Sequence, residues 1–283
     1  MKDCTATPQT PAVAATSSTP RVLPGEQQAL FREVLLLLED AGCSYAVAGA
    51  FALRQHTGIC RFTKDLDVFL TTRAASEALP IFESRGFRCE VCDSIWLAKV
   101  HRDGYFVDFI TGMSNGIIVV QESWIQHALP AEVCGVRSRV LAPEEMIASK
   151  LFVTRRERFD GADIAHIIFA LKGKLDWNRI LDLAGDHWEL VLWNLILFKY
   201  VYPAHADYVP QDLWRELIGR LANNVQSPGA PPRFRGTLVD DAMFAIDVEE
   251  WGLDNLLAEQ RARTAEIKPC ARSQRARSKS RAS

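Results

Sequence analysis

The stretch that most constrains the fold of this chain runs over residues 45–70. It reads Y-A-V-A-G-A-F-A-L-R-Q-H-T-G-I-C-R-F-T-K-D-L-D-V-F-L. A short apolar strand ends at Gly49, a helix is expected over 50–56, and a second apolar strand carries Asp65 and Asp67. Because successive side chains of a strand point to opposite faces, these two aspartates share one face. Two neighbouring carboxylates repel each other there unless a cation lies between them.

This stretch combines two kinds of binding element. The N–H groups at a helix N-terminus are unpaired and favour phosphate, and a glycine such as Gly49 lets the backbone approach a phosphate without a Cβ in the way. Carboxylate oxygens suit Mg²⁺ or Mn²⁺, which proteins bind through a few carboxylates together with substrate phosphates. The sequence therefore predicts a phosphate site and a metal site on adjacent elements, which transfer of a nucleotidyl or phosphoryl group requires.

A third carboxylate is expected on a later strand. Residues 95–100 and 105–110 read as two strands joined by a turn at Asp103-Gly104, and Asp-Gly is a strong hairpin signal. Asp108 lies inside the second strand among apolar neighbours, where a charge needs a partner. A metal shared with the first two aspartates would supply that partner. Asp103 is the weaker candidate, because an aspartate in a turn already has a local structural role.

Together these residues resemble the motif of the nucleotidyltransferase superfamily with the DNA polymerase β-like fold. The closer resemblance is to the minimal bacterial nucleotidyltransferases, which include antibiotic-modifying enzymes and type IV toxin transferases. Their motif is a hydrophobic strand, Gly-Gly or Gly-Ser, a helix, and then Arg-x-Thr-x-Asp-hydrophobic-Asp. The matching residues of this chain are Gly49, Arg61, Thr63, Asp65 and Asp67. The chain departs from the motif at Ala50, so no serine hydroxyl contacts the phosphate and only backbone donors remain.

A helical segment beyond residue 142 extends the resemblance. Pro143 and two glutamates suit the start of a helix. The spacing of Lys150, Arg156 and Asp163 resembles a Lys/Arg…Asp…Asp pattern of the same families, whose residues lie near the nucleotide. The resemblance implies that Lys150 lies against the triphosphate, where its charge offsets that of the leaving pyrophosphate. Arg155 is an alternative to Arg156, and the other interpretation is that these are charges on exposed helix faces.

The resemblance implies metal-dependent transfer of a nucleoside monophosphate group from a nucleoside triphosphate to a hydroxyl, with release of pyrophosphate. Asp65 and Asp67 would hold Mg²⁺ or Mn²⁺, and Asp108 would complete a second metal site and accept the proton of the hydroxyl. The acceptor stays open among a small molecule, a tRNA end and a protein side chain, and a toxin-like role stays open as well.

Two other functions remain. One is a nucleotide-binding module of the same fold that has lost catalysis, for which Ala50 is the one hint. The other is a metal-dependent phosphohydrolase, which is less favoured because such sites usually add histidine ligands. No His-x-Asp or paired-histidine motif lies near the aspartates.

The expected architecture is α+β: a small mixed β-sheet flanked by helices and followed by a helical region. Short strands are also expected over 116–120 and 133–141. The domain prediction is a disordered segment over 1–25, a nucleotidyltransferase domain over 26–141, a helical domain over 142–225, and a linker with a partly disordered basic tail over 226–283.

Composition supports a cytoplasmic protein without a membrane span. The net charge of −2 does not indicate a general nucleic-acid binder. The longest apolar stretch, 190–198, is far shorter than a bilayer requires. Residues 268–283 carry several Arg and Lys and no acid, so they could add weak, salt-sensitive contact with RNA, although a solvated tail is the simpler interpretation.

Overall fold

The computed structural model describes residues 23–226 and 232–267. Within these residues, a seven-stranded mixed sheet has the strand order β3-β4-β5-β2-β1-β7-β6, and a small hairpin, β8–β9, stands apart from it. The strands are β1 (Ala46–Val47), β2 (Asp65–Phe69), β3 (Arg88–Asp93), β4 (Leu97–Arg102), β5 (Tyr105–Ile110), β6 (Leu129–Val133), β7 (Val136–Val140), β8 (Thr154–Arg155) and β9 (Arg158–Phe159). The predicted α+β architecture with a mixed sheet is confirmed.

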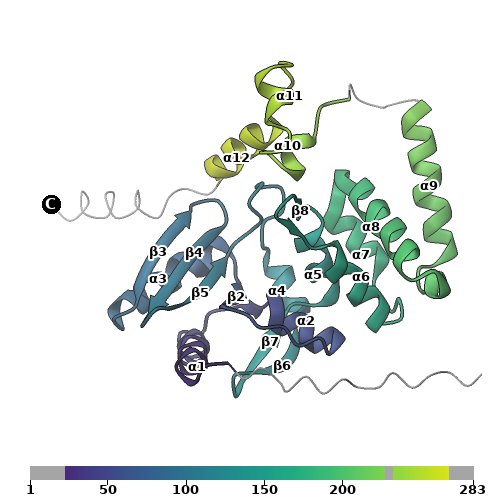
Figure 1. Ribbon diagram of the computed structural model, residues 1–283. Coiled ribbons are helices and arrows are strands. Elements are labelled where there is room, and N and C mark those ends of the chain that lie inside the picture. Colours follow the sequence, from purple (N-terminus) through teal and green to yellow (C-terminus); the bar gives the residue numbers. More distant parts are fainter. Residues whose placement is uncertain (1–22, 227–231, 268–283) are drawn as a thin grey trace, which may run out of the picture.

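The helices form three groups: those packed around the sheet, those of a helical region beside it, and those of the C-terminal segment (Figure 1). The helices of the sheet region are α1 (Gly25–Asp40), α2 (Gly49–Thr57), α3 (Thr72–Ser84) and α4 (Glu122–His127). The helical region contains α5 (Pro143–Lys150), α6 (Gly161–Ala170), α7 (Trp177–Ala184), α8 (Trp188–Val201) and α9 (Gln211–Gln226), with 3₁₀ turns at Gly185–His187 and Pro203–Tyr208. The C-terminal segment, residues 232–267, contains α10 (Gly236–Val239), α11 (Ala245–Glu249) and α12 (Leu256–Ile267).

Alternation along β2 separates the core from the polar face of the sheet. Leu66 and Val68 are fully buried, whereas Asp65 and Asp67 are only partly covered. Strand geometry places residues two apart on the same face, so the two aspartates lie together opposite the apolar pair. The apolar side chains of β2 join those of α1 and β5 in the core. Burial of this apolar set therefore fixes which face carries the carboxylates.

Register brings the third aspartate beside the first two. Strand β2 pairs in parallel with β5, and Asp67 is the partner of Asp108 in that ladder. Strand β5 is reached through the predicted hairpin, since β4 and β5 pair antiparallel around Asp103 and Gly104, both with positive φ. The predicted hairpin is therefore confirmed, and the parallel pairing of its second strand with β2 sets Asp108 beside Asp67.

The predictions of two short strands were wrong. The strand expected over 116–120 is absent, and this loop contributes only an isolated bridge between Gly112 and Val119. The strand expected over 133–141 is the end of one strand and all of the next, because β6 and β7 form a hairpin. Cys134 and Gly135 both have positive φ at its tip, so the chain reverses where the apolar pattern continues.

One continuous hydrophobic cluster includes side chains of the sheet region and of the helical region. Helix α5 packs against α2 of the sheet region and against α6 and α7 of the helical region. The division predicted at residue 142 therefore falls within a shared core, and it stays a prediction. The segment predicted as disordered over 1–25 and the basic stretch over 268–283 lie almost entirely outside the described residues. Residues 232–267 of the predicted C-terminal tail are described and contain three helices.

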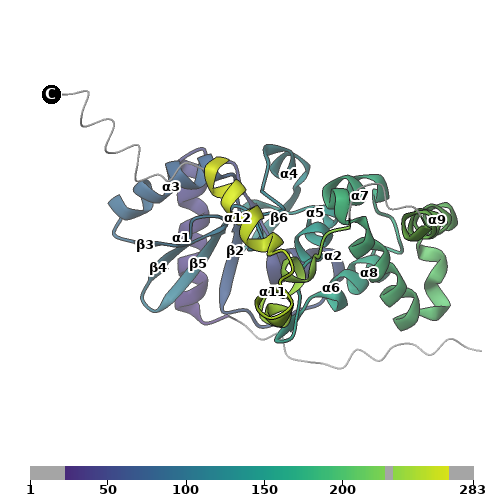
Figure 2. The same cartoon turned by 90° about the horizontal axis from the view of Figure 1, so that it is seen from above.

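The C-terminal segment lies across the molecule rather than extending away from it (Figure 2). Helix α12 contacts the sheet region: Arg261 binds Asp93 at 2.8 Å, and the Thr264 hydroxyl donates to the Gly116 carbonyl at 2.9 Å. At its other end, Asp240 accepts a hydrogen bond from the backbone N–H of Arg156 at 3.0 Å. The segment thus joins the sheet region to the β8–β9 hairpin. Within the described chain, no helix is long and apolar enough to cross a membrane.

Candidate active site

Three carboxylates meet on the polar face of the sheet. Asp65 and Asp67 come from β2 and Asp108 from β5, and one oxygen of each lies within 4.8 Å of the others. We refer to these three residues as the aspartate triad. The Thr63 hydroxyl donates to the Asp65 carboxylate at 2.8 Å, which orients that side chain. The structure therefore brings together the three carboxylates that were expected from the sequence.

Gly49 lies directly against the triad. Its φ is +56°, a left-handed value that side chains disfavour, and a Cβ there would overlap Oδ2 of Asp67. The backbone N–H of Ala48 donates to the Asp67 carbonyl at 2.8 Å, which ties the turn to the strand. Helix α2 begins at this turn without a side-chain cap, so its first N–H groups are free of capping side chains. Gly49 and Ala50 therefore place a helix N-terminus beside the carboxylates.

Asp108 is paired with a lysine that the motif did not include. Lys99 on β4 donates to Oδ1 of Asp108 at 2.6 Å. Burial raises the pKa of Asp108, and the hydrogen bond and charge of Lys99 oppose that rise. In the antiparallel β4–β5 hairpin, Lys99 is the register partner of Asp108. This pairing follows from the position of the Asp103-Gly104 turn, so the sequence did contain a signal for the contact.

A second cluster of charged side chains lies mainly in the helical region that follows the sheet in the sequence. Lys150 is buried and binds Asp160 at 2.6 Å and Asp163 at 2.9 Å. Asp163 also binds Arg61 at 2.5 Å, and Asp160 binds Arg158 at 3.1 Å. We call these five residues the basic network, because three cations and two carboxylates leave one positive charge in excess. It connects three predicted residues, Arg61, Lys150 and Asp163.

The three arginines of the β8–β9 hairpin have different partners. Arg156 is exposed at the tip, where its backbone N–H binds Asp240. Arg155 approaches Asp241 at 3.7 Å and donates to the Ser114 hydroxyl at 3.3 Å. Arg158 alone returns to the basic network, and it helps lower the pKa of Asp160 against the effect of burial. The sequence pattern did not single out Arg158, because the turn between the two strands decides which arginine reaches Asp160.

The electrostatics of the triad fit a divalent cation. Burial, reinforced by Asp65 and Asp108, raises the pKa of Asp67 to about 7, although Lys150 and Arg158 act in the opposite direction. Asp67 therefore keeps its proton to a higher pH than an ordinary aspartate, because the nearby cations do not fully offset burial and the two other carboxylates. Oxygen ligands from carboxylates are those that Mg²⁺ and Mn²⁺ prefer. The residues of the triad therefore match the metal that the sequence predicted.

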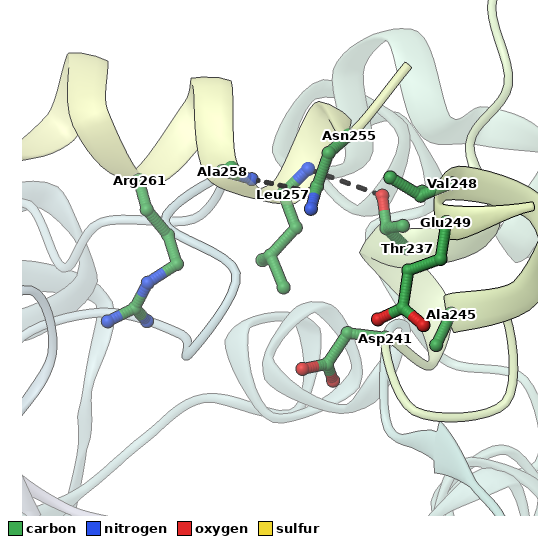
Figure 3. A pocket seen from close by; sticks show the side chains of 9 residues that line it. All are labelled: Thr237, Asp241, Ala245, Val248, Glu249, Asn255, Leu257, Ala258 and Arg261. Carbon is green, nitrogen blue, oxygen red and sulfur yellow. Dashed lines mark hydrogen bonds between the residues drawn. The ribbon is translucent and has the colours of Figure 1, made fainter. Parts of the chain in front are cut away.

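A separate cavity lies within the C-terminal segment (Figure 3). It has a volume of about 460 Å³, and none of the predicted site residues lines it. Figure 3 shows the carboxylates of Asp241 and Glu249 entering from the α10–α11 side and Arg261 projecting from α12. The Arg261 guanidinium is already bound to Asp93. The cavity is therefore distinct from the triad and from the basic network.

A family of nucleotidyl transferases of unknown function (DUF2204) matches residues 27–184. The chain belongs to this family. The matched residues extend from α1 to the end of α7, and they contain the Gly49 turn, the triad and the basic network. The C-terminal segment lies outside the match. No curated protein matches this nucleotidyl transferase.

Several solved structures resemble this nucleotidyl transferase at low identity. The solution structure of the antibiotic-resistance factor ANT(2'')-Ia is 14% identical, with a TM-score of 0.43, over 64% of this chain and 99% of that one. A nucleotidyltransferase-like antigenic protein from Paracoccidioides brasiliensis is 16% identical, with a TM-score of 0.42, over 66% and 95%. The lincosamide adenylyltransferase LnuA, bound to lincomycin, is 16% identical, with a TM-score of 0.37, over 50% and 95%.

Proposed function

We propose that this chain transfers a nucleoside monophosphate group from a nucleoside triphosphate to a hydroxyl acceptor, with release of pyrophosphate and dependence on Mg²⁺ or Mn²⁺. The observation that carries the proposal is the position of the aspartate triad beside the Gly49 turn. That arrangement sets three carboxylate oxygens against the uncapped N-terminus of α2. A carboxylate cluster and a phosphate-binding turn are the two parts that nucleotidyl transfer needs at one place.

Each group of side chains has a distinct role in this proposal. The N–H groups at Gly49 and Ala50 bind phosphate oxygens, and the missing Cβ of Gly49 allows the close approach. The basic network would offset the negative charge that accumulates on the leaving pyrophosphate with its excess positive charge. Thr63 holds Asp65 in place through its hydroxyl.

The carboxylates of the triad are the proposed metal ligands. Asp65 and Asp67 would hold a divalent cation, which when bound supplies charge neutralisation to the phosphates. Asp108 is the candidate acceptor for the proton of the attacking hydroxyl, because it lies beside Asp67 and burial raises its pKa. The acceptor itself stays open among a small hydroxylated molecule, an RNA end and a protein side chain.

The test is transfer from radiolabelled nucleoside triphosphates with Mg²⁺ or Mn²⁺, with total cellular RNA and a cell extract as acceptors. Label should move to one acceptor class, and Asp65→Asn should abolish the transfer. Asp103→Asn is the matched control, since Asp103 lies in the β4–β5 turn with a positive φ that asparagine tolerates. Nucleotide binding without pyrophosphate would indicate a binding module instead, and release of label without any acceptor would indicate a phosphohydrolase.

A further inference from the structure

Charged side chains follow one another across the face of the sheet that carries the triad. Lys99 on β4 is the register partner of Asp108 on β5, and Asp108 is the partner of Asp67 on β2. Directly paired residues of neighbouring strands project to the same face and interact there. The row therefore sets one lysine ammonium at the edge of a cluster of three carboxylates.

Lys99 is held in this position from two sides. Its Nζ lies 2.6 Å from Oδ1 of Asp108 and 4.0 Å from the centre of the Phe106 ring. The side chain is 23% exposed, so water covers only a small part of it. Hydrogen bonds between ionised groups are strong, and an ammonium over an aromatic ring gains further attraction. Lys99 is thus a fixed cation rather than a mobile surface charge.

This position matters for how many metal ions the triad can take. A second divalent cation at Asp108 would lie on the same carboxylate that Lys99 already contacts through Oδ1, so the ammonium would repel it at short range. Among the described residues no lysine forms an ion pair with Asp65, whose carboxylate accepts a hydrogen bond from the neutral hydroxyl of Thr63. The two ends of the triad therefore differ: one is open to a cation, and the other already has one supplied by the protein.

We propose that Lys99 fills the second cation position of the site. The triad then binds one divalent cation tightly through Asp65 and Asp67, and a second cation binds weakly at Asp108 because the Lys99 ammonium repels it. This inference rests on the proposed function for the identity of the metal. It adds that the number of tightly bound ions is set by a side chain of β4.

The test is titration of the full chain with Mn²⁺ in the absence of nucleotide, with free Mn²⁺ followed by electron paramagnetic resonance. The wild-type protein should bind one ion tightly. Lys99→Met and Lys99→Gln should bind two, with affinity at the second site raised by at least about tenfold, a modest change in binding free energy. Lys99→Arg keeps the charge and should retain a single tight site.

Two further variants show that the contact, rather than net charge, is responsible. Lys64→Met removes a charge from an exposed lysine next to Asp65 that makes no ion pair among the described residues, and it should bind one ion as the wild type does. Asp108→Asn combined with Lys99→Met should lose the second site again, because its ligand is gone. Equal stoichiometry and affinity in the wild type and both neutral Lys99 variants would overturn the proposal, as would two equally tight sites in the wild type.

The test distinguishes a failure of the Lys99 proposal from loss of the fold and from failure of the proposed transfer activity. Circular dichroism and thermal unfolding of each variant show whether it retains the fold before it is titrated. Because the titration contains no nucleotide, an unchanged ion count in folded Lys99 variants would refute the role of Lys99 while transfer by the wild type stands. A change from one ion to two without any transfer to an acceptor would refute the proposed function alone.

Discussion

A side chain at Gly49 and the carboxylate of Asp67 would occupy the same space, since a Cβ at Gly49 would overlap Oδ2 of Asp67. The glycine is therefore required twice, once by its positive φ and once by its neighbour. The turn that offers N–H groups to a phosphate and the strand that offers oxygens to a metal are in contact at this point.

Gly49→Ala should therefore weaken both the fold and the metal site. The positive φ alone costs about 1–2 kcal/mol for a residue with a side chain, and the overlap with Asp67 adds to it. Chemical denaturation and Mn²⁺ titration would measure the two effects. Gly58→Ala is the matched control, because Gly58 also has a positive φ but nothing within 4 Å of its Cβ position. If Gly49→Ala lost no more metal affinity than Gly58→Ala, the steric argument would be wrong.

The raised pKa of Asp67 predicts how stability depends on pH. Its pKa is about 7 in the metal-free fold, against 3.8 for an ordinary aspartate. Below the lower value Asp67 is neutral in both states. Between the two values the unfolded chain loses its proton first, so the metal-free fold becomes less stable as pH rises, until the folded pKa is passed. Thermal unfolding in a chelator should show this loss in the wild type.

The same shift predicts competition between protons and metal. Asp67 must lose its proton to bind a cation, so affinity for Mg²⁺ should increase as pH rises through about 7. Asp67→Asn is the comparison for both measurements, since it removes the titrating group and keeps the size of the side chain. Stability and metal-affinity profiles with the same pH dependence in the two proteins would show that another group is responsible.

Ala50→Ser should strengthen nucleotide binding. The added hydroxyl stands at the start of α2, where the resemblance places a phosphate, and one hydrogen bond contributes about 0.5–1.5 kcal/mol. Affinity for a nucleoside triphosphate with Mg²⁺ should then rise by about two- to tenfold. Calorimetric titration would measure it, with Ala52→Ser, a buried position of the same helix, as the comparison. A fall in affinity for Ala50→Ser alone would place the phosphate elsewhere.

Lys150→Met should destabilise the basic network and weaken nucleotide binding. The substitution breaks two buried ion pairs, and such a break costs about 3–5 kcal/mol. We expect the lower end, because Asp160 retains Arg158 and Asp163 retains Arg61. Denaturant unfolding would give the stability, and KM for the triphosphate the binding effect. Lys150→Arg should recover most of the KM, whereas an unchanged KM in folded Lys150→Met would leave Lys150 a purely structural role.

Arg261→Leu should loosen α12 from the sheet region. The guanidinium binds Asp93 and donates to the Ser114 carbonyl at 2.6 Å, and hydrogen bonds of a charged group contribute about 1.5–3 kcal/mol. Hydrogen exchange should rise across residues 256–267 and not in β2. Arg263→Leu is the control, because Arg263 is exposed on the same helix. Equal exchange in the two variants would mean that apolar contacts alone hold the helix.

Much of the site could be predicted from local pattern. Alternation in β2 placed Asp65 and Asp67 on one face, and the Asp103-Gly104 turn placed Asp108 on a neighbouring strand. These inferences depend on short-range geometry, which the sequence expresses directly. The assignment of catalytic and binding roles stays a prediction.

Other features depended on relationships that pattern does not express. Arg158 was missed because three arginines lie close together and only the tip of the β8–β9 hairpin decides which of them meets Asp160. The strand expected over 133–141 was wrong because the positive φ of Cys134 interrupts an apolar run. Lys99 is a different case, because counting the register of the predicted hairpin pairs it with Asp108, and the family motif, which lacks this lysine, drew no attention to it.

The C-terminal segment has a consequence for how such a chain can change over generations. It lies outside the stretch that matches the family, and it is attached to the Gly116 loop and to the β8–β9 hairpin by hydrogen bonds and to the shared apolar core by Leu238. A substitution at Leu238 would disturb that core, whereas substitutions at the exposed positions of the segment would not. The exposed positions can therefore be remodelled in descendants while the carboxylates on the sheet stay fixed.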